Sequence, residues 1–146
     1  MVSGAATPPQ ITVLAFDFGT RRLGVAVGNT LVRSAHALAT IDEERSDERF
    51  TAVARLVAEW QPGLLVVGLP VHADGSEHEM TARARRFARQ LEGRFRLPVA
   101  FADERYTTEE AGRRLAESGA GRRGRVERDA LAAQLILQGW FDEQQP

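Results

Sequence analysis

Asp17 is an acidic residue near the end of residues 11–18, a largely apolar run that predicts a buried β-strand. A buried, ionised carboxylate costs several kcal/mol unless it is paired, hydrogen-bonded or bound to a cation. Two interpretations are open. Asp17 either supports the turn at Gly19, by capping it or by pairing with Arg21 or Arg22, or it is a metal ligand. The second interpretation requires other carboxylates at the same place.

Two further acidic positions stand at the ends of elements that should be buried. Asp103 and Glu104 follow a short apolar run, residues 99–102. Neighbouring strand residues face opposite sides, so the spacing does not decide which of the two acids faces a site, and both could be solvated acids before the next helix. Asp129 lies on a helical face that is otherwise apolar, formed by Ala132, Ala133, Ile136 and Trp140. Alternatively, Asp129 belongs to the first turn of that helix, where an acid is favourable.

Carboxylates gathered from three distant segments would repel one another and raise one another's pKa unless a cation lay between them. Oxygen ligands without a cysteine or histidine cluster favour Mg²⁺ or Mn²⁺ over zinc. Two such ions roughly 3.5–4 Å apart can activate a water molecule and stabilise the leaving oxygen of a phosphodiester. The acids therefore predict phosphoryl hydrolysis with two divalent ions. The three histidines show no ligand spacing and are expected in loops or at the surface: His36, His72 and His78.

Strands and helices that could bring these acids together follow from the pattern of apolar residues and turn signals. The predicted elements are strands at 11–18, 23–28 and 31–40, a helix at 46–60, a strand at 64–69, a helix opened by a Ser76/Glu79 capping box and running to about 94, a strand at 99–102, a helix at 107–118 and a helix at 126–141. Short turns make the first three strands an antiparallel meander. The prediction is an α/β fold with a five-stranded mixed sheet, helices on both faces and ligands beyond the carboxyl ends of the strands.

The composition predicts one domain, residues 11–142, between a disordered tail at 1–10 and a short tail at 143–146. Cysteine is absent, which excludes disulfides and thiolate zinc sites and favours a reducing cytoplasm. No segment has the roughly 18 apolar residues that a membrane span needs. We expect a cytoplasmic protein that makes no membrane contact.

Four motifs lie in order within residues 11–142: AFDFGTRRLGVAVG, VVGLPVHADGS, ADERYTTEEA and ERDALAAQLIL. In this order and at these separations, the chain resembles the YqgF/RuvX family. The resemblance implies an RNase H-like fold and a function as a Holliday-junction resolvase or as a nuclease that matures the 5′ end of 16S rRNA. It also implies that Asp17, Glu104 and Asp129 are the catalytic, metal-binding acids, and so favours Glu104 over Asp103. The chain departs from common family residues at His72 and Tyr106.

Nucleic acid is the expected partner, although the net charge is −1, because all 19 basic residues are arginine, whose guanidinium suits phosphate oxygens. Glycines permit close approach of a phosphate backbone, and arginines in a glycine-punctuated loop, residues 119–125, could order on it. The expected contacts are Gly19, Thr20, Arg21, Gly68, Arg105, Arg122, Arg123 and Arg125.

The leading hypothesis is a metal-dependent nuclease acting on structured nucleic acid, most specifically on the 5′ end of pre-16S rRNA. The alternatives are a Holliday-junction resolvase-like DNA nuclease and a module that binds nucleic acid without cutting it. A third alternative is an ATP-using phosphotransferase, because DFGT followed by GVAV also resembles the phosphate-binding hairpin of actin-like proteins. Both a monomer and a homodimer are compatible with the sequence.

Overall fold

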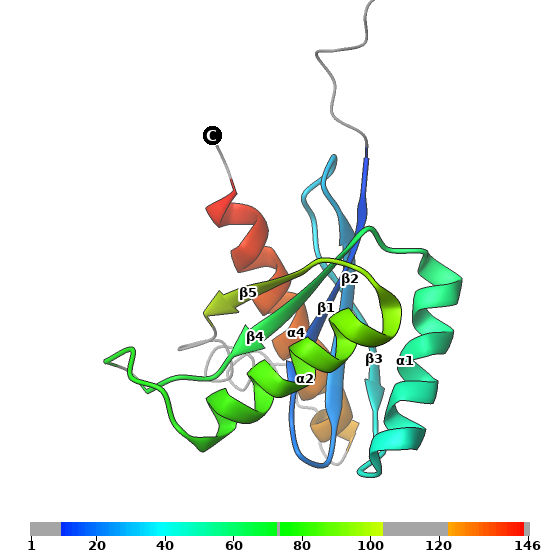
Figure 1. Cartoon of the computed structure of the whole chain (residues 1–146). Coiled ribbons are helices and arrows are strands. Elements are labelled where there is room, and N and C mark those ends of the chain that lie inside the picture. The colour runs from blue at the N-terminus through cyan, green and yellow to red at the C-terminus, as the bar shows by residue number, and fades with distance from the viewer. Residues whose placement is uncertain (1–9, 73, 104–122, 145–146) are drawn as a thin grey trace, which may run out of the picture.

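The computed structural model describes residues 10–72, 74–103 and 123–144, which form a five-stranded sheet with helices on both faces (Figure 1). The elements are β1 (Thr12–Phe18), β2 (Leu23–Asn29), β3 (His36–Ile41), α1 (Ser46–Trp60), β4 (Leu64–Leu69), α2 (Glu79–Phe95), β5 (Val99–Asp103) and α4 (Arg123–Glu143). The predicted helix at 107–118 lies outside the described residues. So do residues 1–9 and 145–146 of the predicted tails.

The sheet has the strand order β3-β2-β1-β4-β5. Short turns make β1, β2 and β3 antiparallel neighbours, whereas α1 and α2 connect strands that run parallel, with β4 beside β1 and β5 beside β4. The predicted α/β class, mixed five-stranded sheet and initial meander are confirmed. The carboxyl ends of β1, β4 and β5 therefore lie along one edge of the sheet, as the predicted site requires.

Alternation along β1 divides its side chains between two hydrophobic cores. Leu14 and Phe16 face α1 and α2, and the ring of Phe16 meets that of Phe87 edge-on at a centroid distance of 5.9 Å. Val13 and Ala15 face α4 on the other side. All four β1 side chains are fully buried, and burying one large apolar side chain contributes roughly 1.5–3 kcal/mol. The end of β1 is consequently held from both sides.

Helix α4 lies very close to the hairpin formed by β1 and β2. Its buried residues Ala133 and Phe141 belong to the same core as Ala15 and Ala26, whose small side chains keep the helix near the strands. A Cβ added at Gly28 would lie 2.8 Å from the ring atom Cε2 of Phe141, so glycine leaves room for this ring. None of the helices in the described ranges is long and apolar enough to cross a membrane.

Strand β3 begins at His36, so the prediction of a strand from residue 31 was wrong. The side-chain oxygen of Asn29 accepts hydrogen bonds from the backbone N–H groups of Leu31 (3.1 Å) and Val32 (2.8 Å), which closes a turn. Arg33 then has a positive φ of 58°, incompatible with an extended strand. Leu31 and Val32 are 67% and 65% exposed, so their strand propensity is not supported by burial.

Helix α1 has the predicted bounds, because Gln61 adopts a left-handed conformation (φ 46°) directly before Pro62. Helix α2 starts at Glu79, and the predicted Ser76/Glu79 capping box was wrong. The cap is His78, whose ring Nδ1 accepts a hydrogen bond from the backbone N–H of Met80 at 3.2 Å. Ser76 instead donates its hydroxyl to the carboxylate of Asp74 at 2.7 Å.

Candidate active site

Asp17 projects from the sheet on the face covered by α4. The alternation of β1 places it with Val13 and Ala15, which pack against that helix. In the antiparallel ladder Asp17 stands opposite Gly24 of β2, one step from the turn formed by residues 19–22. Asp17 is half-buried at the mouth of the core and forms an interaction within the protein.

Gly24 fixes where α4 crosses the hairpin. An ideal Cβ at Gly24 would lie only 1.9 Å from the backbone oxygen of Asp129 and 2.5 Å from its carbonyl carbon. The backbones of β2 and α4 thus meet at Gly24, which is the ladder partner of Asp17. Asp129 is also four residues from the buried Ala133, so it belongs to the side of α4 that faces the sheet. Asp17 and Asp129 therefore share one face of one hairpin.

Arg22 binds the carboxylate of Asp129. Its Nε donates a hydrogen bond to Oδ2 at 2.7 Å, and the side chains are 30% and 24% exposed. One of the two arginines considered as partners of Asp17 is thus bound to Asp129. Because α4 begins at Arg123, Asp129 lies in the second turn, and the alternative that placed it in the first turn was wrong.

Asp103 lies on the opposite face of the sheet from Asp17 and Asp129. It pairs in register with Leu69, which packs against the core beneath α1 and α2. Phe101, two residues earlier on the same face, lies under the guanidinium of Arg85 of α2 at 5.4 Å from the ring centroid. Of the pair that the sequence left open, Asp103 thus faces away from the other two acids. Glu104, the acid implied by the family resemblance, lies outside the described residues.

The described residues contain no group of three or more histidine, cysteine, aspartate or glutamate side chains arranged to hold a metal ion. Asp17 and Asp129 supply two carboxylates to one face, a donor type that fits a hard divalent cation. The histidines occupy loop and surface positions, as expected: His36 is exposed at the start of β3, and the rings of His72 and His78 lie 4.7 Å apart before α2.

Several of the expected nucleic-acid contacts surround the two acids. Gly19, Thr20 and Arg21 form most of the turn after β1. The parallel ladder pairs Phe16 with Val67, so Gly68 lies beside Asp17 at the adjoining strand end. Arg105 and Arg122 lie outside the described residues. The prediction that Arg123 and Arg125 lie in a loop was wrong, because the backbone is helical from Arg123 onward.

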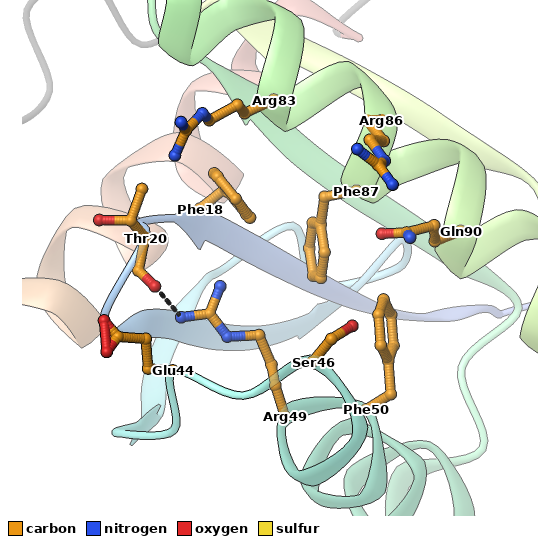
Figure 2. Close-up of a pocket in the computed structure, with 10 residues that line it drawn as sticks. All are labelled: Phe18, Thr20, Glu44, Ser46, Arg49, Phe50, Arg83, Arg86, Phe87 and Gln90. Carbon is orange, nitrogen blue, oxygen red and sulfur yellow. Dashed lines mark hydrogen bonds between the residues drawn. The ribbon is translucent and has the colours of Figure 1, made fainter.

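Arg49 is a buried arginine that holds the turn and that the sequence did not single out. It donates from Nη1 to the backbone oxygen of Gly19 (2.7 Å), from Nη2 to that of Thr20 (3.2 Å) and from Nε to that of Glu43 (2.9 Å) (Figure 2). Burial lowers its pKa, and the charge of Glu44 opposes that effect. Its position four residues before the buried Val53, on the apolar stripe of α1, was a signal that could have identified it.

Comparisons of the sequence with known families give one match over nearly the whole chain. The model of the RuvX family, described as "Holliday junction resolvase", matches residues 11–143. This range includes β1 through α4, and therefore both acids and the hairpin that separates them.

Individual relatives are more than half identical to the chain. A protein of Chromobacterium violaceum named "Putative pre-16S rRNA nuclease" is 57% identical over 132 residues, which cover 89% of this chain and 96% of the relative. A protein of Nitrosomonas europaea with the same name is 60% identical over 132 residues, covering 90% of this chain and 89% of the relative.

The fold is that of RuvC. The structure of Thermus thermophilus RuvC superimposes with a TM-score of 0.55 at 16% sequence identity, covering 92% of this chain and 96% of that protein. RuvC from the same organism in complex with a Holliday junction substrate gives 0.56 at 17% identity, covering 92% and 95%. The predicted RNase H-like architecture is thereby confirmed.

Proposed function

Because the chain belongs to the RuvX family, we propose that it is a divalent-metal-dependent nuclease that hydrolyses phosphodiester bonds in structured nucleic acid, and that it processes the 5′ end of pre-16S rRNA. Names that refer to pre-16S rRNA belong to relatives at 57% and 60% identity, which favours an RNA substrate. The observation that carries the proposal is the placement of Asp17 and Asp129 on one face of the β1–β2 hairpin.

Glu104 is proposed as the third acid. Two facts support this choice over Asp103: the resemblance of residues 102–111 to a family motif, and the position of Asp103 on the wrong face of the sheet. We expect Glu104→Gln to abolish cleavage and Asp103→Asn to preserve it. Equal loss of activity in both variants would contradict the assignment.

Asp17, Glu104 and Asp129 would hold Mg²⁺ or Mn²⁺, two ions in the full proposal. When bound, such ions supply an activated water and stabilise the leaving oxygen of the phosphodiester. The chain itself contributes position and charge. Gly24 sets α4 at the height of Asp17, Arg22 orients the Asp129 carboxylate, and the turn at 19–22 offers exposed backbone for a phosphate to approach.

Cleavage of branched DNA is the second candidate activity. It is supported by the description of the family and by the shared fold with a RuvC that was solved on a Holliday junction. That structure is 17% identical and informs the fold alone, so it supports this substrate less strongly than the relatives support RNA. Ribosomal RNA as the substrate would place the protein, one nuclease domain over residues 11–142, in the cytoplasm.

The proposal is tested with purified wild-type protein, Asp17→Asn and Asp129→Asn, each incubated with pre-16S rRNA 5′ fragments and with four-way junctions in Mg²⁺ or Mn²⁺. We expect both variants to lose at least about 100-fold in cleavage rate, as is typical when a transition-state electrostatic group is removed. Wild-type rates in both variants, with either substrate, would disprove the proposed site.

Asp142→Asn is the matched control. Asp142 is an exposed aspartate on the same helix as Asp129, near its other end, and it accepts a hydrogen bond from Gln138. We expect this variant to cleave at the wild-type rate. Faster cleavage of pre-rRNA than of junction DNA by the wild-type protein would support the RNA assignment, and the reverse order would support the second candidate.

A further inference from the structure

A cavity of about 270 Å³ opens on the face of the sheet opposite Asp17 and Asp129, between α1, α2 and the turn after β1 (Figure 2). Its relation to the candidate active site follows from β1, whose neighbouring residues Asp17 and Phe18 point to opposite faces. The two sites therefore lie back to back at the same strand end.

The cavity is rich in positive charge. Arg83 and Arg86 of α2 lie across it from Arg49 of α1 (Figure 2), and Glu44 is the acid among its lining residues. Arg83 also pairs with Glu79 at 2.9 Å. Within the described ranges, Arg86 forms no ion pair or hydrogen bond. A guanidinium is always charged, so the cavity favours an anion.

Arg49 adds donors to the cavity in addition to charge. A guanidinium has five N–H donors, and three of them bond the carbonyl oxygens of Glu43, Gly19 and Thr20. Carbonyl oxygens satisfy hydrogen bonds without cancelling a full positive charge. Arg49 is only 5% exposed, so an anion beside it would interact in surroundings of reduced dielectric screening. The neutral hydroxyl groups of Thr20 and Ser46 also line the space.

We propose that this cavity binds a backbone phosphate of the nucleic acid, as a second contact beyond the bond that is cut. The inference rests on the proposed nuclease function and specifies where its substrate continues. The turn at 19–22 joins the two places: Arg49 holds the backbone oxygens of Gly19 and Thr20 on the cavity side, and Arg22 of the same turn holds Asp129 on the other side. A strand that crosses this turn reaches both sites.

Arg86→Gln is the principal test, because Arg86 is exposed and its loss breaks no bond within the described residues. Binding of a fluorescent pre-16S rRNA 5′ fragment is measured with EDTA present, so that no cleavage occurs. We expect roughly tenfold weaker binding, the loss expected for one charged hydrogen bond. We also expect the slope of log K against log[salt] to fall by roughly 0.7 per lost phosphate contact on a single strand.

Arg89→Gln is the matched control. Arg89 is an exposed arginine of the same helix that does not line the cavity. Equal weakening by Arg86→Gln and Arg89→Gln would show a diffuse charge effect and overturn the proposal. Retained cleavage with unchanged binding in Arg86→Gln would overturn it while leaving the nuclease function intact.

Inorganic phosphate provides a second arm. NMR signals of the Arg49 and Arg86 side chains are followed during a phosphate titration and, separately, during titration with the RNA fragment. Shifts with both ligands support the proposal. Shifts with phosphate alone, together with unimpaired RNA binding by Arg86→Gln, would identify a site for a small anion and reject the backbone contact. A wild-type protein that binds RNA through Arg86 but never cleaves would instead refute the proposed function alone.

Discussion

Arg22 Nε lies 2.7 Å from Asp129 Oδ2, and this ion pair connects the first hairpin to the last helix across 107 residues of sequence. A guanidinium thus occupies one side of a carboxylate that we propose as a metal ligand. The pair is partly exposed, and such pairs contribute only about 0.5–1 kcal/mol to stability. Its larger effect should be on the competition between Arg22 and a divalent ion for Asp129.

Arg22→Gln is therefore expected to bind Mn²⁺ more tightly than the wild type, because one positive charge beside the carboxylate is removed. The free energy of unfolding without metal should fall by about 0.5–1 kcal/mol. Calorimetric titration with Mn²⁺ and urea denaturation measure the two effects. Arg21→Gln, a change at the exposed neighbour, should affect Mn²⁺ binding less. Weaker Mn²⁺ binding in Arg22→Gln would show that Arg22 positions Asp129 and does not compete for it.

Gly24→Ala should be strongly destabilising, since the new Cβ would lie 1.9 Å from a backbone oxygen of α4 that cannot move independently. We expect a loss of at least about 2 kcal/mol in the free energy of unfolding, measured with urea. The control is Gly139→Ala in the same helix, where an added Cβ has no neighbour within 4 Å. Alanine there should stabilise the protein by about 0.5–1 kcal/mol. A neutral Gly24→Ala would contradict the close contact between Gly24 and Asp129.

Arg49→Met should loosen the turn after β1. Methionine keeps an apolar side chain of similar length but leaves the backbone oxygens of Glu43, Gly19 and Thr20 without their donor. We expect a loss of about 2 kcal/mol in stability and faster amide hydrogen exchange at residues 19–22. Arg55→Met, at an exposed position of the same helix, should leave both unchanged. Unaltered exchange in Arg49→Met would show that the turn is held by other contacts.

The Ser76 hydroxyl and, next, the Ser76 backbone N–H hold the pKa of the Asp74 carboxyl below its usual range. The folded protein therefore favours the ionised form, and this stabilisation is lost as the pH falls through the lowered pKa. Ser76→Ala should raise the pKa of Asp74 only partway to its usual value, because the backbone donor remains at 2.9 Å. Carboxyl NMR titration measures the change, with Ser34→Ala as the control. An unchanged titration in Ser76→Ala would exclude the hydroxyl as the main cause.

Most of the fold was predictable because its elements have local boundaries. Pro62 and Gly63 end α1 and precede β4, so both elements have the predicted bounds. The predictions failed where a side chain redirects the backbone. Asn29 closes a turn that delays β3, and His78 caps α2 with a ring nitrogen, a role that sequence patterns assign to serine or threonine.

The candidate site was predictable in its residues more than in its arrangement. An acid on an apolar face identified Asp129, and an acid in a buried strand identified Asp17. Their common location depends on Gly24, where helix and strand backbones touch, and no local pattern encodes such a tertiary contact. Arg49 was missed for a similar reason, because its carbonyl partners come from the β1–β2 turn and the loop before α1.

The docking of α4 against the hairpin has a consequence for when the protein can act. Asp17 is supplied by the first strand and Asp129 by the final helix, and the two acids share a face only after that helix has packed into the space left by Gly24. A nascent or truncated polypeptide that lacks the helix would retain the arginines of α2 and could still attach to RNA. It would have no means of cutting, so cellular transcripts are safe from the unfinished enzyme.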